Sequence, residues 1–264
     1  MSATAGPPVD KNVAGKGRKD VPAIVGNDPP RHRDGRSIWL RAEDGHSLDA
    51  WCVEPDGDAH WGAVILQEIF GVNAHVRETC ERYADLGACA IAPALFDRAQ
   101  RKTELDYNAE GVAIGRELRE RVGWDAAVAD VKAAVDEASR YGPVCVIGYC
   151  WGGTLAFLSA TRFDNVACAI SYYGGQTVPF AHEKIAAPVM MHFGSEDPRI
   201  PEADREIIQS GNPGIEAHVY PADHGFNCDH RKEFHAPSAA LSMERNLAFL
   251  AAHIGAGRIN NPET

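Results

Sequence analysis

The stretch Gly148-Tyr149-Cys150-Trp151-Gly152-Gly153 is the part of this chain whose residue types and spacing most clearly suggest chemistry. It follows the apolar run 143–147, which predicts a buried strand that turns sharply into a helix. In the G-x-S-x-G form of this turn, the residue between the glycines projects its side chain above the sheet, at the start of the next helix. Because Cys150 occupies that position, we predict that it is a nucleophile. The alternative is a buried structural cysteine, since free cysteine is often buried.

Two later strand ends supply the partners that a nucleophilic thiol needs. In an α/β-hydrolase sheet, the nucleophile is followed along the chain by an acid and then by a histidine. The apolar run 188–193 ends in a loop that contains Asp197, and the run 217–220 ends in a loop that contains His224. We therefore predict that Asp197 orients His224 and that His224 is the base. Otherwise Asp197 caps a turn or helix, and His224 is a loop residue without a role.

The chain resembles the dienelactone hydrolases, a family within the α/β-hydrolases, from about residue 37 to about residue 250. The segment 67–73, the turn around Cys150, and the positions of Asp197 and His224 carry this resemblance. It implies an α/β-hydrolase fold with a catalytic triad. It also implies an activity like that of carboxymethylenebutenolidase, a hydrolase of carboxylic ester bonds.

The resemblance assigns roles to three further residues. Glu68 matches a buried glutamate that contacts the resting thiol and helps to convert it to thiolate when substrate binds, and Ile69 and Trp151 match the donors of the two oxyanion N–H groups. General chemistry agrees, because a thiol with a pKa of about 8.5 needs an imidazole or a helix N-terminus to favour its thiolate at neutral pH. We predict a thioester acyl-enzyme that His224 releases by activating water, with no metal or organic cofactor.

Substrate recognition is less well defined by the sequence. Family members that cleave dienelactone hold its carboxylate with arginines, one of which lies a few residues after the catalytic histidine, where this chain has Cys228. Arg231 is nearby but out of register. Phe70 is predicted to line the pocket, because it adjoins a predicted oxyanion residue. Candidates on the other side of the pocket are Arg98, Arg101 and Arg116. We expect a lactone or a small carboxylic ester as substrate and leave its acyl group open.

The segment from His224 to His235 also contains Cys228, Asp229 and His230, and all of these residue types bind zinc. Their spacing matches none of the compact zinc patterns, so we predict no metal site in this segment. Five other cysteines are expected to be small buried residues with reduced thiols, namely Cys52, Cys80, Cys89, Cys145 and Cys168.

Composition limits the remaining possibilities. A chain of 264 residues with 45% hydrophobic residues forms one large core. We expect an α/β-hydrolase domain over 37–256, a flexible N-terminal extension over 1–36 and a tail over 257–264. The net charge of −11 argues against a nucleic-acid partner. No apolar stretch approaches the roughly 18 residues of a membrane-spanning helix, so we expect no membrane partner and a cytoplasmic location. We also expect the protein to be a monomer.

Strands and helices alternate along the chain, which predicts a mostly parallel central sheet with helices on both faces and the site at the carboxyl ends of the strands. Strands are expected near 38–40, 48–53, 63–66, 89–92, 143–147, 167–172, 189–193 and 217–220. Helices are expected near 73–86, 111–121, 124–139 and 239–254, and a helix should also follow Cys150. The polar connection 93–108 is predicted to overhang the pocket.

Two other classes of function stay open. The first is a thiol redox or glutathione-handling protein that uses Cys150, and the second is a non-catalytic relative that binds a ligand. A redox protein needs a resolving cysteine, and Cys145 lies on the strand, where its side chain is expected to point elsewhere. A non-catalytic relative would be expected to have lost Asp197, His224 or Glu68, and all three are present. Hydrolysis is therefore the leading hypothesis.

Overall fold

The computed structural model describes residues 34–260 and confirms the predicted class, a mostly parallel sheet with helices on both faces. The sheet has eight strands in the order β1-β2-β4-β3-β5-β6-β7-β8. The pairs β1/β2 and β2/β4 are antiparallel, and all later pairs are parallel. The strands are β1 (Arg36–Arg41), β2 (Ser47–Val53), β3 (Trp61–Leu66), β4 (Ala88–Pro93), β5 (Val144–Tyr149), β6 (Cys168–Tyr172), β7 (Val189–Gly194) and β8 (Glu216–Tyr220).

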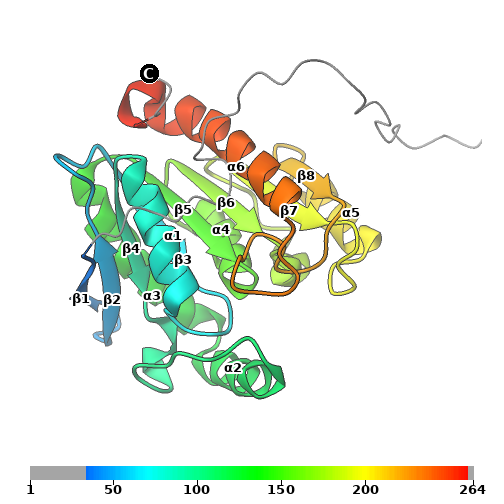
Figure 1. Cartoon of the computed structure of the whole chain (residues 1–264), viewed down its shortest axis with the longest axis horizontal. Coiled ribbons are helices and arrows are strands. Elements are labelled where there is room, and N and C mark those ends of the chain that lie inside the picture. The colour runs from blue at the N-terminus through cyan, green and yellow to red at the C-terminus, as the bar shows by residue number, and fades with distance from the viewer. Residues whose placement is uncertain (1–33, 261–264) are drawn as a thin grey trace, which may run out of the picture.

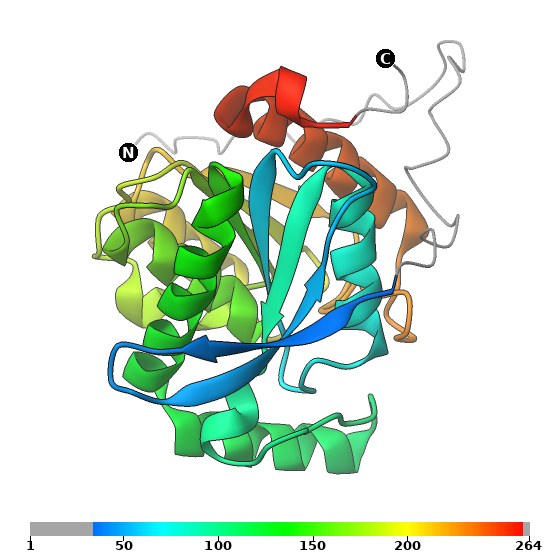
Figure 2. The ribbon, with the colours of Figure 1, turned by 90° about the vertical axis from the view of Figure 1, so that its left-hand side faces the viewer.

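Helices cover the sheet on both sides. Helices α1 and α6 lie on one face, and α3 and α4 lie on the other (Figures 1 and 2). The α-helices are α1 (Ala74–Asp85), α2 (Ala109–Val122), α3 (Trp124–Ala138), α4 (Trp151–Arg162), α5 (Glu202–Gly211) and α6 (Ala236–Leu250). Shorter helical turns are η1 (Leu95–Arg98), η2 (Ser139–Tyr141), η3 (Gly175–Phe180), η4 (Ala251–Gly255) and η5 (Ala256–Arg258).

The burial of each strand follows its place in the sheet. Every residue of the central strands β3, β4 and β5 is buried, as expected for strands that are covered by helices on both faces. The edge strands β1 and β8 keep exposed residues. Within residues 34–260, none of the helices combines the length and apolar character that crossing a membrane requires.

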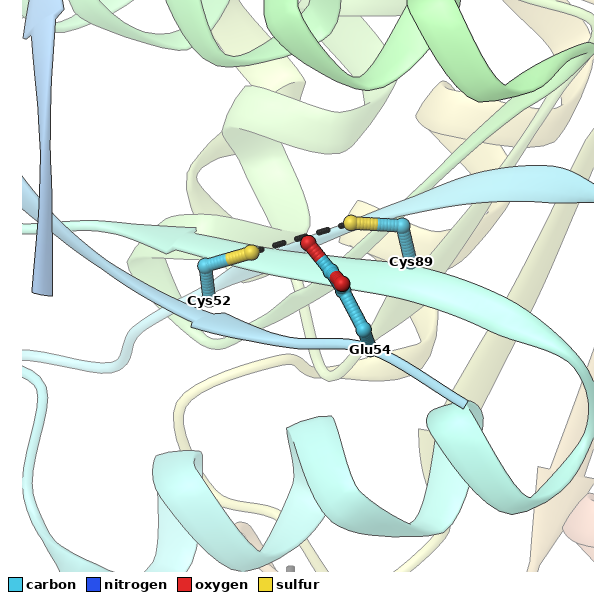
Figure 3. A group of neighbouring side chains, drawn as sticks. All are labelled: Cys52, Glu54 and Cys89. Atoms are coloured by element: carbon cyan, nitrogen blue, oxygen red, sulfur yellow. Dashed lines mark hydrogen bonds between the residues drawn. The ribbon is translucent and has the colours of Figure 1, made fainter. Parts of the chain in front are cut away.

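The cysteines that were predicted to be small buried residues are buried in the structure. Two of them come close together, since Cys52 Sγ on β2 lies 3.7 Å from Cys89 Sγ on β4 (Figure 3). Cys145 lies opposite Cys168 on the neighbouring strand β6. Both contacts are consequences of strand pairing, which the sequence pattern alone does not reveal.

The structure differs from the expected elements in two places. Helix α5 was not predicted from the sequence, and only Ile208 of its ten residues is buried. The connection 93–108 begins with η1 and then runs beside the segment after β3, where Leu105 N donates to Phe70 O at 2.9 Å. The predicted N-terminal extension lies almost entirely outside the described residues, so the division into extension, domain and tail stays a prediction.

Candidate active site

Cys150 stands at a sharp turn between β5 and α4. Its backbone has φ 56° and ψ −111°, a conformation that is strained for a residue with a side chain. The turn closes only because its neighbours are glycines, since a Cβ on Gly148 would lie 1.9 Å from the backbone oxygen of Gly152. A Cβ on Gly152 would lie 2.5 Å from the backbone oxygen of Leu66. The structure therefore has the geometry that the glycine spacing predicted, with a partly exposed thiol at the start of α4.

His224 and Asp197 form a buried pair. His224 Nδ1 lies 2.7 Å from Asp197 Oδ2, and both side chains are more than nine-tenths buried. The pairing assigns the Nδ1 proton to a bond with the carboxylate, which leaves Nε2 facing away from Asp197. Nε2 is buried and makes no hydrogen bond within the described residues. An acid that holds one nitrogen of an imidazole and leaves the other unpaired is the arrangement that a general base requires.

The pKa of His224 depends on its interaction with Cys150. Burial lowers the pKa of the His224 ring, but the interaction with Cys150 and the hydrogen bond to Asp197 outweigh it and raise the pKa to about 10. Attraction between the imidazolium and the sulfur in its thiolate form is the larger part of the effect of Cys150. The protonated ring stabilises the folded protein fully below pH 6.5, and this contribution is lost as the pH rises toward about 10.

The removal of the sulfur should therefore be visible in the titration of this histidine. In Cys150→Ala, we expect the pKa of His224 to fall from about 10 toward its ordinary value of 6.5, because the charge that favours the imidazolium is gone. An NMR titration of the ring measures this pKa in the parent and in the variant. Cys80→Ala, which removes a buried thiol of α1, is the control and should leave the titration unchanged. Equal pKa values in the parent and in Cys150→Ala would contradict the coupling.

Glu68 is buried next to a cation. Its Oε1 accepts a hydrogen bond from Arg231 Nη1 at 3.0 Å, and its Oε2 is buried without a hydrogen-bond partner among the described residues. The Arg231 guanidinium also lies over the rings of Phe70 and Tyr107, at 5.9 and 5.6 Å. Burial lowers the pKa of Arg231, but the charge of Glu68 above all raises it overall, and Cys150 contributes to the rise. The resemblance implies a contact between Glu68 and the resting thiol, which stays a prediction.

The two predicted oxyanion residues come from segments that are tied together. Ile69 follows β3, and Trp151 is the first residue of α4, where backbone N–H groups have no partner within the helix. Gly152 N donates to Gln67 O at 3.2 Å, which joins the start of α4 to the segment that carries Ile69. Helix α2 packs directly on this segment, because a Cβ on Gly115 would lie 1.9 Å from Ile69 O. Their role as oxyanion donors stays a prediction.

Tyr173 was not among the predicted site residues, and the structure places it beside the predicted base. It follows β6 with φ 40°, which is unusual for a residue with a side chain. Its ring lies against the ring of His224, with centroids 4.9 Å apart. The hydroxyl is buried and has no hydrogen-bond partner among the described residues. Only the neighbouring Gly174 could have indicated an unusual backbone at this position.

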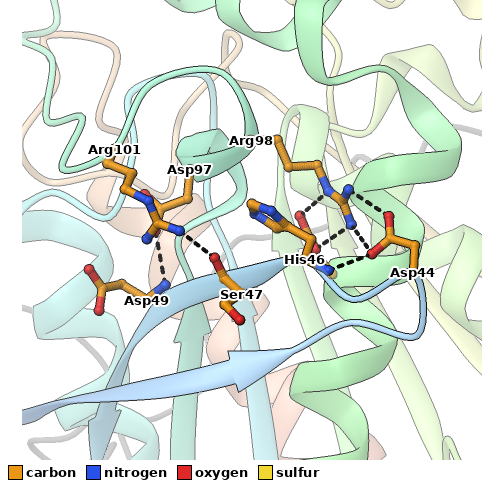
Figure 4. A network of polar contacts seen from close by, with 8 residues as sticks. Asp44, His46, Ser47, Asp49, Asp97, Arg98 and Arg101 are labelled. Carbon is orange, nitrogen blue, oxygen red and sulfur yellow. Dashed lines mark hydrogen bonds and ion pairs between the residues drawn. The ribbon is translucent and has the colours of Figure 1, made fainter.

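Two of the arginine candidates on the other side of the predicted pocket are held in structural ion pairs (Figure 4). Arg98 donates to the fully buried Asp130 and to Asp44, at distances from 2.7 to 3.2 Å. Arg101 donates to Asp97 at 3.2 Å and to the backbone oxygen of Ser47. These contacts join η1 to α3 and to the loop before β2. Arg116 is an exposed residue of α2.

The spacing of the residues between His224 and His235 predicted no metal site, but Asp229 and His230 lie together with His75 of α1, with the ligand atoms of all three within 4.8 Å of one another. Asp229 contacts His75 of α1, with Oδ1 3.3 Å from Nδ1, and pairs with Arg82. His230 Nε2 lies 2.8 Å from Glu78 Oε2. His235 Nδ1 lies 2.7 Å from the hydroxyl of Ser238. The contacts to α1 attach this loop to the helix that covers one face of the sheet.

Comparisons with known proteins show that the chain is similar to ester and lactone hydrolases. A model of the dienelactone hydrolase family matches residues 48–254. A carboxymethylenebutenolidase of Pseudomonas putida is 35% identical over 229 residues, which cover 81% of this chain and 95% of the relative. A crystal structure of a candidate dienelactone hydrolase of Klebsiella pneumoniae has a TM-score of 0.72 at 29% identity and covers 84% of this chain and 99% of that one. A Pyrococcus furiosus esterase has the same fold, with a TM-score of 0.62 at 16% identity over 89% of this chain and 97% of that one.

Proposed function

The chain belongs to the dienelactone hydrolase family, a family of hydrolases of ester and lactone bonds, and on that premise we propose that it acts through a thioester formed on Cys150. The observation that carries the proposal is the position of this thiol. It stands at a strained turn at the start of α4, and the buried pair of His224 and Asp197 is coupled to it by charge. A thiolate and an imidazolium are the ionic forms that such an arrangement favours.

The proposed reaction has two halves. In the first, the Cys150 thiolate attacks the carbonyl carbon of the lactone or ester, and the tetrahedral oxyanion is held by the N–H groups of Ile69 and Trp151. The intermediate then collapses, the C–O bond breaks, and the alkoxide leaving group takes the proton of the His224 imidazolium. In the second, neutral His224 removes a proton from water, hydroxide attacks the thioester, and the carboxylic acid leaves as the thiolate re-forms.

Glu68 and Arg231 are proposed to set the charge of the site before substrate arrives. A carboxylate near the Cys150 sulfur would disfavour the thiolate, because two negative charges repel, and Arg231 lessens this repulsion by compensating the carboxylate. Arg231 therefore supplies the cation that position 228 lacks. A carboxylate group on the substrate would compete with Glu68 for this guanidinium. The substrate that we favour is therefore a lactone or small ester that also carries a carboxylate group.

The other classes of function have less support. A redox role needs a second thiol within reach of Cys150, and Cys145, the cysteine nearest to it in the sequence, lies within β5 opposite Cys168. A purely ligand-binding role does not explain why His224, Asp197 and Glu68 are all present and each buried. Hydrolysis uses each of these residues.

A panel of dienelactone, simple lactones and p-nitrophenyl esters tests the proposal. We expect turnover of at least one class by the parent protein and trapping of a covalent adduct on Cys150, detected by mass spectrometry of the intact protein and of its peptides. Dienelactone turnover that falls in Arg231→Lys through a rise in KM would support recognition of a carboxylate, since lysine keeps the charge but loses the forked geometry. An adduct on any other residue, or no turnover of any member, would contradict the mechanism.

A further inference from the structure

Strands β2 and β4 bring two thiols and a carboxylate to one face of the sheet, away from Cys150. In the antiparallel register of β2 and β4, Cys52 pairs with Ile91 and Val53 pairs with Ala90. One further step along this register places Glu54 opposite Cys89. Because side chains two residues apart share a face, Cys52 and Glu54 point to the same side as Cys89. The three side chains converge in the structure (Figure 3).

The geometry points to a site for a thiophilic divalent cation such as Zn²⁺, held by Cys52 Sγ, Cys89 Sγ and a carboxylate oxygen of Glu54. The two sulfurs lie 3.7 Å apart, and all three donor atoms lie within 4.8 Å of one another. Two Zn–S bonds of about 2.3 Å at the tetrahedral angle place their sulfurs about 3.8 Å apart. The pair therefore has the spacing of two thiolates on one cation, whereas a disulfide would need the sulfurs to approach to about 2 Å.

The surroundings suit this donor set. Cys52 and Cys89 are almost completely buried, while the Glu54 side chain is 49% exposed and gives a cation access from solvent. Arg36 and Tyr141 both donate to Oε1 of Glu54, at 2.6 and 3.5 Å, so we assign Oε2 to the cation. One position of a tetrahedral cation is left for water.

The charges also balance. Two thiols lose their protons to solvent when one divalent cation binds, so the two thiolates and the cation together are neutral. The remaining negative charge of Glu54 is compensated by Arg36. Binding would link β2 to β4, where the sheet changes from antiparallel to parallel pairing.

Cadmium is the most direct probe, because its bonds to thiolates absorb in the ultraviolet. We would titrate reduced Cys150→Ala protein with Cd²⁺, since this background removes the thiol that is not buried. One Cd²⁺ per chain is expected, with the absorption of two thiolates and a release of protons. Zn²⁺ should displace the absorption and should raise the temperature of unfolding, since it binds only the folded pair.

Variants in the same background locate the site. Cys52→Ala and Cys89→Ala should each abolish the absorption, and Glu54→Gln should weaken Cd²⁺ binding by at least about tenfold, because even the loss of an outer partner of a ligand costs about 10- to 100-fold. Cys145→Ala is the matched control and should bind as the parent does, since its pair with Cys168 is equally buried but has no carboxylate in the same cluster.

Three outcomes would overturn the proposal. They are unchanged absorption in Cys52→Ala or Cys89→Ala, unchanged affinity in Glu54→Gln, and loss of binding in Cys145→Ala with its folding intact by circular dichroism. If the cysteine variants fail to fold, cadmium NMR of the Cys150→Ala protein decides, because the chemical shift reports the number of bound thiolates. A shift typical of two sulfurs supports the site, and a shift typical of nitrogen and oxygen ligands alone overturns it. The result is independent of the proposed hydrolysis.

Discussion

Cys150→Ala is expected to lower kcat on the best lactone or ester substrate by about 10⁴-fold or more, because the variant has no atom with which to form the acyl-enzyme. The structure gives this residue a position that no neighbour duplicates. Its φ of 56° and its place as the residue before α4 put the thiol alone at the apex of the turn. Steady-state kinetics and intact-protein mass spectrometry measure the effect, and the thioester adduct should vanish with the activity.

Two further variants, His224→Ala and a thiol control, test whether the loss of activity is specific to Cys150 acting with His224. His224→Ala should lose activity to a similar degree, and the double variant should lose little more, since residues that act as a unit are not additive. Cys80→Ala removes a buried thiol of α1 and should keep the parent kcat. If Cys150→Ala retains more than a tenth of the parent kcat, or if the effects of Cys150→Ala and His224→Ala multiply, the thiol is not the nucleophile that His224 serves.

The predicted triad positions come together because each one lies at the end of a strand that the sequence pattern identifies. Apolar runs predict β5, β7 and β8, and parallel pairing places their carboxyl ends at one edge of the sheet. The loops that carry Asp197 and His224 therefore lie at the same edge of the sheet as the turn that carries Cys150. The 2.7 Å contact between His224 and Asp197 is what this reasoning leads one to expect.

The place of Arg231 could not be predicted in this way, because it depends on the path of a loop. Two successive turns, from Gly225 O to Cys228 N and from Cys228 O to Arg231 N, carry the chain back toward Glu68. Gly225 makes room for the arginine, since a Cβ there would lie 2.7 Å from Arg231 Cζ. Counting from His224 points to Cys228 instead, because sequence spacing does not record these turns.

The contact between the two thiols of β2 and β4 also could not be predicted from the sequence. Both cysteines are recognisable as buried residues, but their contact depends on the register of two strands that are not consecutive in the chain. The strand that intervenes in the sequence, β3, pairs with the other side of β4. Local patterns predict which face a residue occupies, and only the assembled sheet determines which residues share that face.

The buried ion pair of Glu68 and Arg231 leads to the second large effect, which is on stability. The side chains of Arg231 and Glu68 are only 9% and 3% exposed, so the removal of one charge leaves the other buried without compensation. We expect Arg231→Met to lower the free energy of unfolding by about 3–5 kcal/mol. Methionine keeps an unbranched chain against Phe70 and Tyr107, so the loss reports charge more than packing. Urea unfolding of the parent and the variant measures the difference.

A double-mutant cycle separates the ion pair from the other contacts of Arg231. Glu68→Gln should also destabilise the protein, because the longer contact to Glu233 at 3.4 Å is then the remaining ion pair of Arg231 among the described residues. In the double variant both charges are gone, so its loss should be smaller than the sum of the two single losses by roughly 1–3 kcal/mol. Strictly additive losses would mean that the two side chains do not stabilise each other. That result would remove Arg231 as the counter-ion of Glu68 and, with it, the proposed role of Arg231 in setting the charge of the site.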